Sequence, residues 1–530
     1  MEHIAVTVKG ENMISDNNSR TKNATRNIFA GLTNKIVHLV FPFIIRSVII
    51  QSLGTKYLGL SSLFASILQV LNLAELGFSN AIIYNMYRPV AEKDKATICA
   101  LLNLYKKIYR IIGIVILVGG LVLLPFLPNL IKGDVPADIN LYILYAIYLV
   151  NTASTYFLFA YKSALVNAHQ RNDIVSSVHT ITSILQFVAQ IIVLLVLKNY
   201  YAYIIVQCIT SILNNVLVAI IAKKKYPEYI CAGEVSKEQK KDIRKRVAGL
   251  MIQKVCGTTR NSLDSIFISA MIGLSAVAIY SNYYVIMNAI IGVMGIVTSS
   301  ITASVGNSIV TESEEKNYRD MKKFNFIYMW MSGWLTVCLL CLYQPAMKLW
   351  MGQENMFSFS VVVLFCIYFY SLKMGDIRAV YSDAKGLWYE NRFRAIAESI
   401  ANVILNLVLG HFFGVHGIIA GTLISLLIIN FGYGSQILFK HYFKHHKASE
   451  YFTLHGLYAL ITASICYATY SICSLVNSSG ITELALKGVI CVIAPNLFYL
   501  FIYRKTDQLK EAKRFLHNLL RPLLKKLKRN

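Results

Sequence analysis

The stretch KVCGTTRNSLDSIFISAMIGLSAVAIYSNYYVIMNAIIGVMGIVTSSITASVGN, from Lys254 to Asn307, decides the fold because it places charged residues inside otherwise apolar segments. Arg260 and Asp264 are four residues apart and share one face of a helix, and Asn261 belongs to the same polar stripe. A charged group in hydrocarbon costs at least about 2.5 to 3.5 kcal/mol, so such a face normally turns towards a partner or a wet cavity. The stretch therefore predicts a membrane helix that lines a transport path.

The composition of the whole chain agrees with a membrane protein. The 530 residues are 56% hydrophobic and only 15% charged, and the mean hydropathy is +0.52. Apolar runs of spanning length recur along the chain and leave no room for a sizeable soluble domain. We predict an all-α polytopic membrane protein.

The apolar runs predict about 14 transmembrane helices. The second, eighth and tenth have polar ends, which is typical of longer, tilted or broken helices. The predicted spans are residues 31–53, 58–84, 108–130, 141–161, 174–197, 201–222, 247–272, 276–309, 324–343, 358–372, 395–413, 415–439, 451–476 and 481–503.

Basic residues alternate between the two sides of these spans. Of the 52 Lys and Arg, 42 fall on one side, five on the other and five within spans or at their ends. By the positive-inside rule, both termini are predicted to be cytoplasmic. The net charge of +25 is thus a signal of topology, and a nucleic-acid partner is not expected.

A weak internal repeat divides the chain. Gly54 and Gly273 each follow a charged span at an offset of 219 residues, which places Lys35 on Lys254. An even number of spans separates the copies, so the repeat is parallel. We expect two six-helix bundles and two extra C-terminal helices. The expected segments are a cytoplasmic N-terminal segment (1–30), the first bundle (31–222), a basic cytoplasmic linker (223–246), the second bundle (247–439), the extra pair (451–503) and a basic amphipathic cytoplasmic tail (504–530).

The first span carries a second charged stripe. Lys35, His38, Pro42 and Arg46 share one helix face. Arg46 lies eight residues before one repeat glycine and Asp264 nine before the other, so both are expected at similar depths. One interpretation is that both charges line a transport path. The other is a structural ion pair between Arg46 and Asp264 that clamps the two halves together.

Other charged residues have two interpretations each. Glu75 is either a proton or sodium site, or a helix-end carboxylate bonded to the backbone or to Arg88. Asp376 and Arg378 are expected to form a solvated salt bridge where the tenth span reaches the cytoplasm.

Cysteine and enzyme motifs give no catalytic or metal site. Cys338 and Cys341 form a CxxC inside an apolar run without a second pair or a nearby histidine, so we expect packed thiols and no metal. No Walker A motif, nucleophile elbow or HExxH is present, and the outer loops are short. We therefore expect no enzyme and no cofactor, with transport driven by an ion gradient, the membrane potential or the substrate gradient.

Three stretches of the chain resemble one transporter family. They are TRNSLDSIFISAMIGLSAVAIYSNYYVIMNAI (259–290), the opening IIRSVIIQSLGTKYLGLSSLFASILQVLNLAELGFSNAIIYNMYRPVAEKD (44–94) and GDIRAVYSDAKGLWYENRFRAIAESIANVILNLVLGHFFGVHGIIAGTLIS (375–425). They are similar to the polysaccharide transporter family, the Wzx-type flippases of the multidrug/oligosaccharidyl-lipid/polysaccharide (MOP) superfamily. The resemblance implies two six-helix bundles around a central cavity, and transport of undecaprenyl-diphosphate-linked oligosaccharide from the inner to the outer leaflet of a bacterial plasma membrane.

The resemblance and the charges together predict a site. A diphosphate brings about two negative charges into a low-dielectric slab, and arginine suits bidentate phosphate contact. The hypothesis is that Arg46 and Arg260, with Lys35 and Asn261, bind the diphosphate and glycan. Asp264, or Glu75, then couples transport to H+ or Na+.

The expected partners are the lipid-linked oligosaccharide, membrane lipids and other membrane proteins of polysaccharide assembly. The alternatives are a multidrug or small-cation antiporter of the same fold, which would favour an acidic cavity, and a membrane glycan polymerase or ligase, which would need a large outer loop.

The charge split predicts the topology directly. Cysteines introduced beside Lys132 and Lys348 should react with an impermeant thiol reagent added outside, and cysteines beside Lys224 and Lys444 should react only after permeabilisation. Labelling of the Lys224 segment from outside intact cells would contradict the assignment.

Overall fold

Helices make up all the regular structure of the described chain. The computed structural model describes residues 2–75 and 78–527, and every regular element in these ranges is a helix. This confirms the all-α prediction. The chain divides into two compact units, residues 1–258 and 259–530.

The first unit is built mainly on α1, which packs along α7, while α7 packs on α8 and α4 on α5. The break between α2 and α3 falls inside the second predicted span and confirms that this span is interrupted. The elements are α1 (Glu2–Ser52), α2 (Thr55–Leu71), the 3-10 helix η1 (Asn72–Glu75), α3 (Phe78–Glu92), α4 (Lys95–Leu123), the 3-10 helix η2 (Leu124–Leu130), α5 (Leu141–Phe157), α6 (Ala160–Ala168), α7 (Asn172–Val196) and α8 (Tyr200–Lys225).

The second unit is centred on α11, which contacts α12, α16 and α17. The helix α9 runs across the boundary between the units. The elements are α9 (Lys237–Met271), α10 (Leu274–Thr311), α11 (Glu314–Met351), the 3-10 helix η3 (Gln353–Asn355), α12 (Phe359–Met374), α13 (Asp376–Lys385), α14 (Arg392–Ser425), the π-helix η4 (Leu426–Tyr433), α15 (Gly434–His441), α16 (Ala448–Ser474), α17 (Gly480–Tyr503) and α18 (Asp507–Leu527).

The helices account for the predicted membrane spans. Ten helices in the described ranges are long and apolar enough to cross a membrane, or eleven if the bent pair α5 and α6 is one span. One of the ten, residues 392–441, contains two predicted spans, and α2 to α3 and α9 carry two more. About 14 membrane helices are therefore consistent with the structure.

Two segments differ from the sequence-based boundaries. The predicted linker 223–246 is partly helical, because α9 begins at Lys237 and continues unbroken to Met271. The helix of the tenth predicted span, α12, ends at Met374, and after Gly375 α13 forms a second, short helix. In both places helical structure continues into charged sequence outside the apolar runs from which the spans were predicted.

The eleventh and twelfth spans form a tight helical hairpin. Gly414 interrupts α14 with φ 56° and ψ −132°, a conformation that suits glycine. Close packing of the two arms follows, because a Cβ on Gly417 would lie 1.8 Å from the carbonyl oxygen of Leu409. Small residues allow membrane helices to approach in this way. The predicted boundary between spans 395–413 and 415–439 coincides with this turn.

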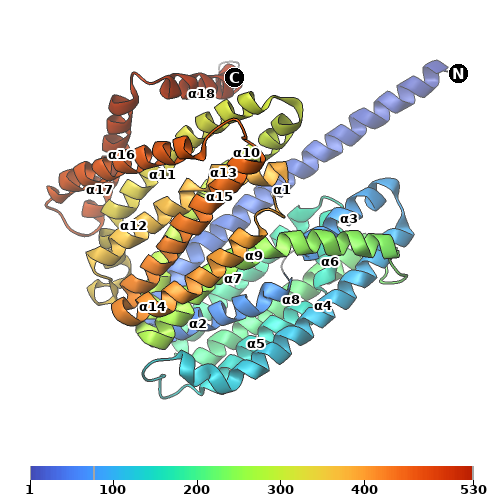
Figure 1. Ribbon diagram of the computed structural model, residues 1–530. Helices are drawn as coiled ribbons and strands as arrows, with labels where there is room; N and C mark the ends of the chain where they lie inside the picture. The colour runs from blue at the N-terminus through green and yellow to red at the C-terminus, as the bar shows by residue number, and fades with distance from the viewer. Residues whose placement is uncertain (1, 76–77, 528–530) are drawn as a thin grey trace. The chain divides into compact units, whose positions relative to one another are not determined.

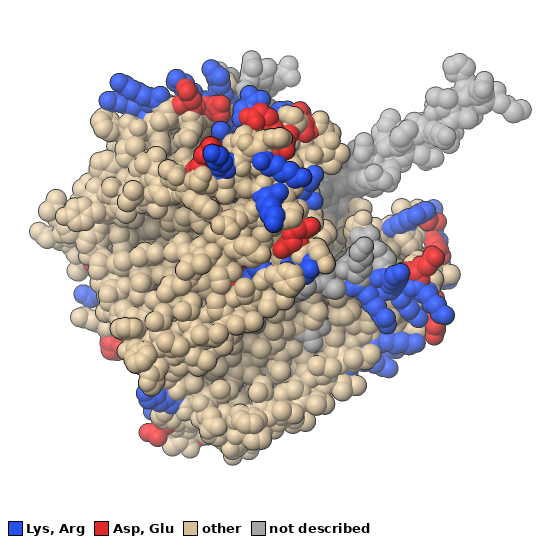
Figure 2. Space-filling model, in the orientation of Figure 1, with Lys and Arg blue, Asp and Glu red and all other residues tan. Residues whose placement is uncertain are grey.

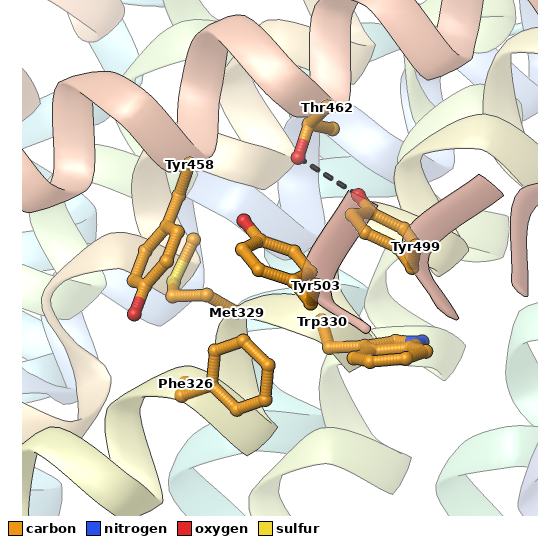
Figure 3. A pocket seen from close by; sticks show the side chains of 7 residues that line it. All are labelled: Phe326, Met329, Trp330, Tyr458, Thr462, Tyr499 and Tyr503. Atoms are coloured by element: carbon orange, nitrogen blue, oxygen red, sulfur yellow. Dashed lines mark hydrogen bonds between the residues drawn. The ribbon is translucent and has the colours of Figure 1, made fainter. Parts of the chain in front are cut away.

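The extra helix pair packs on α11. Figure 1 shows α16 and α17 beside α11, as their contacts require. Aromatic side chains from all three helices meet there. The rings of Trp330 and Tyr499 are tilted with their centroids 5.2 Å apart, and the Tyr499 and Thr462 hydroxyls are 2.8 Å apart (Figure 3). Trp330 also donates Nε1 to Asn496 at 2.8 Å. The pair is thus an integral part of the second unit.

The surface of each unit separates charge from apolar area. In Figure 2 the charged side chains gather mainly towards helix ends, and uncharged residues cover broad areas between them. The tail helix α18 follows another pattern, because Leu509 and Ala512 are buried and Phe515 contacts Phe324 of α11 at 5.5 Å. The first turns of the predicted amphipathic tail therefore pack on protein.

The hairpin makes a first prediction. Gly417→Ala places a Cβ against backbone that cannot move aside, so it should destabilise the protein by about 1 to 3 kcal/mol. Thermal unfolding of the full chain in detergent measures the loss. Gly456→Ala on α16 is the matched control, since no atom lies within 4 Å of its Cβ; it should be neutral or slightly stabilising. Equal stability of the two variants would contradict the close packing.

Candidate functional site: an arginine cluster and a bonded aspartate

A buried carboxylate in the second unit accepts hydrogen bonds from two arginines. Glu398 on α14 is 1% exposed. Its Oε1 accepts from Arg260 Nη1 of α9 at 2.7 Å, and its Oε2 accepts from Arg394 Nη1 at 2.8 Å. Asn430 of η4 donates Nδ2 to the same Oε2 at 2.8 Å. Removal of Glu398 would leave the guanidinium groups of Arg260 and Arg394 without this carboxylate, which is strongly unfavourable.

A third arginine joins this group through Asn430. Arg378 on α13 is 4% exposed and donates Nη2 to Asn430 Oδ1 at 3.1 Å. Its Nε has no hydrogen-bond partner among the described residues. The guanidinium lies against Gly434, where a Cβ would be 2.1 Å from Nη1. We call Arg260, Arg378, Arg394, Glu398 and Asn430 the arginine cluster.

A second carboxylate lies one helical turn from Arg260. Asp264 is fully buried and accepts from Asn406 Nδ2 at 2.7 Å and Thr422 Oγ1 at 3.0 Å on one oxygen, and from Tyr280 OH at 2.9 Å on the other. Asn402 donates to the Thr422 hydroxyl at 2.9 Å. The donors to Asp264 come from α10 and from both arms of the α14 hairpin, and all three are neutral.

Within the arginine cluster the charges do not cancel, although the exposed Asp383 of α13 also acts on Arg378. The cluster holds three guanidinium groups against Glu398, and Asp264 adds one further carboxylate within a turn of Arg260. Guanidinium groups stay protonated in proteins and offer forked donors that match phosphate oxygens. With Asp264 ionised the excess is one positive charge, and with Asp264 protonated it is two. The arrangement can therefore bind an anion.

The sequence candidates fall in both units. Arg260 and Asp264 belong to the second unit. Arg260 pairs with Glu398, and Asp264 accepts from Tyr280, Asn406 and Thr422. Arg46 is half-buried and Lys35 exposed, both on α1 of the first unit. The Asn261 side chain lies outside the described residues. A combined site of Arg46, Lys35 and Arg260 stays a prediction, as does an ion pair between Arg46 and Asp264.

Glu75 has a different neighbour from those expected. It lies in η1, at the break of the second span, and accepts a hydrogen bond from the Tyr109 hydroxyl at 2.5 Å. Arg88 instead pairs with Glu92 at 2.8 Å. The prediction of an Arg88 partner is wrong because Arg88 and Glu92 are neighbours on one turn of α3. A role for Glu75 in ion coupling stays a prediction.

The expected salt bridge between Asp376 and Arg378 is also wrong. Asp376 accepts from Lys373 Nζ at 2.7 Å, while Arg378 is buried against Asn430. Residues two apart on a helix point in different directions, so helix geometry disfavours this pair.

Most of the arginine cluster was missed by sequence reasoning, although a signal exists. Arg394, Glu398, Asn402 and Asn406 recur every four residues through an apolar span. This spacing places them along one helix face, as for Arg260 and Asp264. The structure shows that the two polar stripes face each other.

The family of the chain follows from its sequence. The family model described as "Polysaccharide biosynthesis protein" matches residues 24–305, more than half of the chain. The chain belongs to this polysaccharide biosynthesis family. A comparison with curated protein sequences finds no match.

Solved structures with the same fold are transporters and flippases. The lipid II flippase MurJ in an inward closed conformation is similar over 90% of this chain and 98% of its own, with 16% identity and a TM-score of 0.62. An inward-facing multidrug resistance MATE transporter of the MOP superfamily is similar over 76% of this chain and 94% of its own, with 15% identity and a TM-score of 0.59. The MATE transporter VcmN of Vibrio cholerae is similar over 82% of this chain and 100% of its own, with 15% identity and a TM-score of 0.53.

These comparisons show that this polysaccharide biosynthesis family member shares its fold with the lipid II flippase MurJ and with a MATE transporter of the MOP superfamily. The resemblance stated from sequence is confirmed at this level. The number of long apolar helices in the described residues makes the protein a multi-pass membrane protein.

The arginine cluster predicts a stability effect. Glu398→Gln removes the charge between two arginines and leaves both buried guanidinium groups uncompensated, so the free energy of unfolding should fall by about 3 to 5 kcal/mol. Thermal unfolding in detergent tests this. Glu450→Gln on the exposed start of α16 is the control and should change little. An unchanged melting temperature for Glu398→Gln would mean that the carboxylate does not hold the cluster.

Proposed function

We propose that this family member is an alternating-access flippase that moves diphosphate-linked oligosaccharide lipids from the inner to the outer leaflet. In this proposal the arginine cluster binds the diphosphate. The lipid carrier is undecaprenyl, the membrane is a bacterial plasma membrane, and both termini face the cytoplasm. The protein transports and catalyses no bond-making step.

The excess of arginine over carboxylate carries this proposal. Arg260, Arg378 and Arg394 gather around Glu398, although a buried cation is expensive in a membrane without a matching anion. A structural network would gain most from equal numbers of each charge. A diphosphate supplies about two negative charges and acceptors for forked guanidinium donors. The Arg378 Nε, which has no partner among the described residues, offers one such donor.

Asp264 is the candidate for ion coupling within this proposal. With Asp264 protonated, the three arginines and Glu398 leave two positive charges, which a diphosphate can neutralise. With Asp264 ionised, the same substrate would leave one net negative charge in a low-dielectric site. Uptake of one cation at Asp264, H+ or Na+, would therefore accompany substrate binding.

Two other functions fit less well. A multidrug or small-cation antiporter shares the fold, as the MATE similarity shows, but such a substrate would be repelled by an excess of arginine. A glycan polymerase or ligase would need a large outer domain. The loops predicted to lie on the outer side are short. One of them is residues 131–140, between η2 and α5.

Arginine variants test the site. Arg260→Lys keeps the charge but loses the fork, and Arg260→Ala loses both, so translocation of a lipid-linked oligosaccharide in proteoliposomes should fall stepwise, by about tenfold or more for alanine. Arg378→Ala should show a similar loss. Arg504→Ala, on a surface arginine stacked on Phe501, is the matched control and should transport normally.

A double variant separates binding from structural pairing. Arg260→Ala with Glu398→Ala removes one charge of each sign and preserves the net charge of the cluster. Because the double variant still leaves Arg394 without Glu398, its reference is Glu398→Ala alone: if Arg260 serves only as the partner of Glu398, the double variant should recover transport relative to Glu398→Ala. We expect it to stay inactive at normal abundance, and its recovery would reject phosphate binding by Arg260.

Depletion of the protein in its host tests the function as a whole. Mass spectrometry should then find complete lipid-linked repeat units accumulating in the inner leaflet. Accumulation of single units in the outer leaflet would indicate a polymerase, and unchanged lipid-linked units with altered drug sensitivity would indicate an antiporter.

A further inference from the structure

A group of thiols lies where α11, α16 and α17 meet. The Sγ atoms of Cys341, Cys473 and Cys491 all lie within 4.8 Å of one another. These residues are 3%, 2% and 0% exposed. Cys338 precedes Cys341 by one turn of α11, and its Sγ is 3.9 Å from the carbonyl oxygen of Cys491. We call these four residues the thiol cluster; it shares no residue with the arginine cluster.

We propose that the thiol cluster binds a thiophilic d10 cation such as Zn2+, with Cys341, Cys473 and Cys491 as ligands and Cys338 as the fourth. Zinc–sulfur bonds of about 2.3 Å in a tetrahedron place the sulfur atoms about 3.8 Å apart. Sulfur atoms within 4.8 Å of one another reach that geometry through small side-chain rotations. Thiolate ligands select this class of cation over Mg2+ or Ca2+.

The positions of the cysteines support a site over chance packing. A single buried cysteine commonly fills space as a small hydrophobe. Here the CxxC of α11 presents two thiols on one helix face, and α16 and α17 each add one from far along the sequence. Complete burial is the property of a closed, structural metal site.

Neighbouring groups hold this arrangement in place. Trp334 of α11 donates Nε1 to the Cys491 carbonyl oxygen at 2.8 Å, which fixes α17 against α11 at the level of the thiols. Bonds of this kind around a metal site orient the ligands. Lys487 lies one turn before Cys491 on the same face of α17 and pairs with Glu483 at 2.6 Å.

The chemistry of binding balances simply. Each thiol that becomes a ligand forms a sulfur–metal bond and releases its proton to solvent, and no oxidation occurs. The ammonium of Lys487 lowers the cost of the negative charge that the thiolates bring. The bound cation would join α16 and α17 to α11, beyond the aromatic contacts shown in Figure 3.

The experiment measures metal content and spectra. The full chain, purified without a histidine tag, is incubated with Zn2+ and desalted. Elemental mass spectrometry should find about one Zn2+ per chain. Replacement by Cd2+ should give a sulfur-to-metal charge-transfer absorption, and metal-loaded protein should unfold several degrees higher than metal-free protein.

Matched variants complete the test. Cys341→Ser with Cys491→Ser should lose the metal, the absorption band and the thermal shift, while Cys99→Ser, a buried cysteine of the first unit, should keep all three. If the double serine variant fails to fold, the corresponding double alanine variant and the wild-type Cd2+ spectrum decide. Wild-type protein without metal and without the band, or a disulfide between Cys341 and Cys491, would overturn the proposal.

Discussion

The ion pairs of Glu398 are the interaction on which the polar interior of the second unit depends. One carboxylate, buried in α14, accepts hydrogen bonds from Arg260, Arg394 and Asn430 and so joins α9 and η4 to the hairpin. In a membrane no bulk water can replace a missing partner. The identities of these residues are therefore constrained together, and a change at one position alters the charge balance of all the others.

The same constraint explains why the second unit combines an apolar exterior with charged helices. Arg260 and Asp264 lie on α9, which has little apolar character for a spanning helix, yet their side chains turn to α14 and α10. A helix of this kind is tolerated only where neighbouring helices carry complementary groups. The stripe from Arg394 to Asn406 supplies those groups. The proposed substrate site and the buried polar network thus use the same residues, so variants at this site need both a transport and an unfolding measurement.

Much of the fold could be predicted from sequence, because long apolar runs, basic loops and Gly414 are local signals. The predicted spans coincide with helices, and a broken helix was one of three possibilities that the polar ends of the second span left open. The partner of Arg260 could not be predicted, because the sequence does not show which helix faces α9. Arg378 was misjudged for the same reason, since its apparent position at a helix end hid its burial against Asn430. The thiols show a similar pattern: CxxC is visible in α11, but its neighbours arrive from α16 and α17.

The turn at Gly414 gives Asp264 a mechanical significance. Asn406 precedes the turn and Thr422 follows it, and both donate to the same oxygen of Asp264. Asp264 therefore holds the two arms of the hairpin together at a distance from the turn at Gly414. With H+ as the coupled ion of the proposed transport, protonation of Asp264 would reduce its capacity as a hydrogen-bond acceptor and would weaken the link between the two arms of the hairpin.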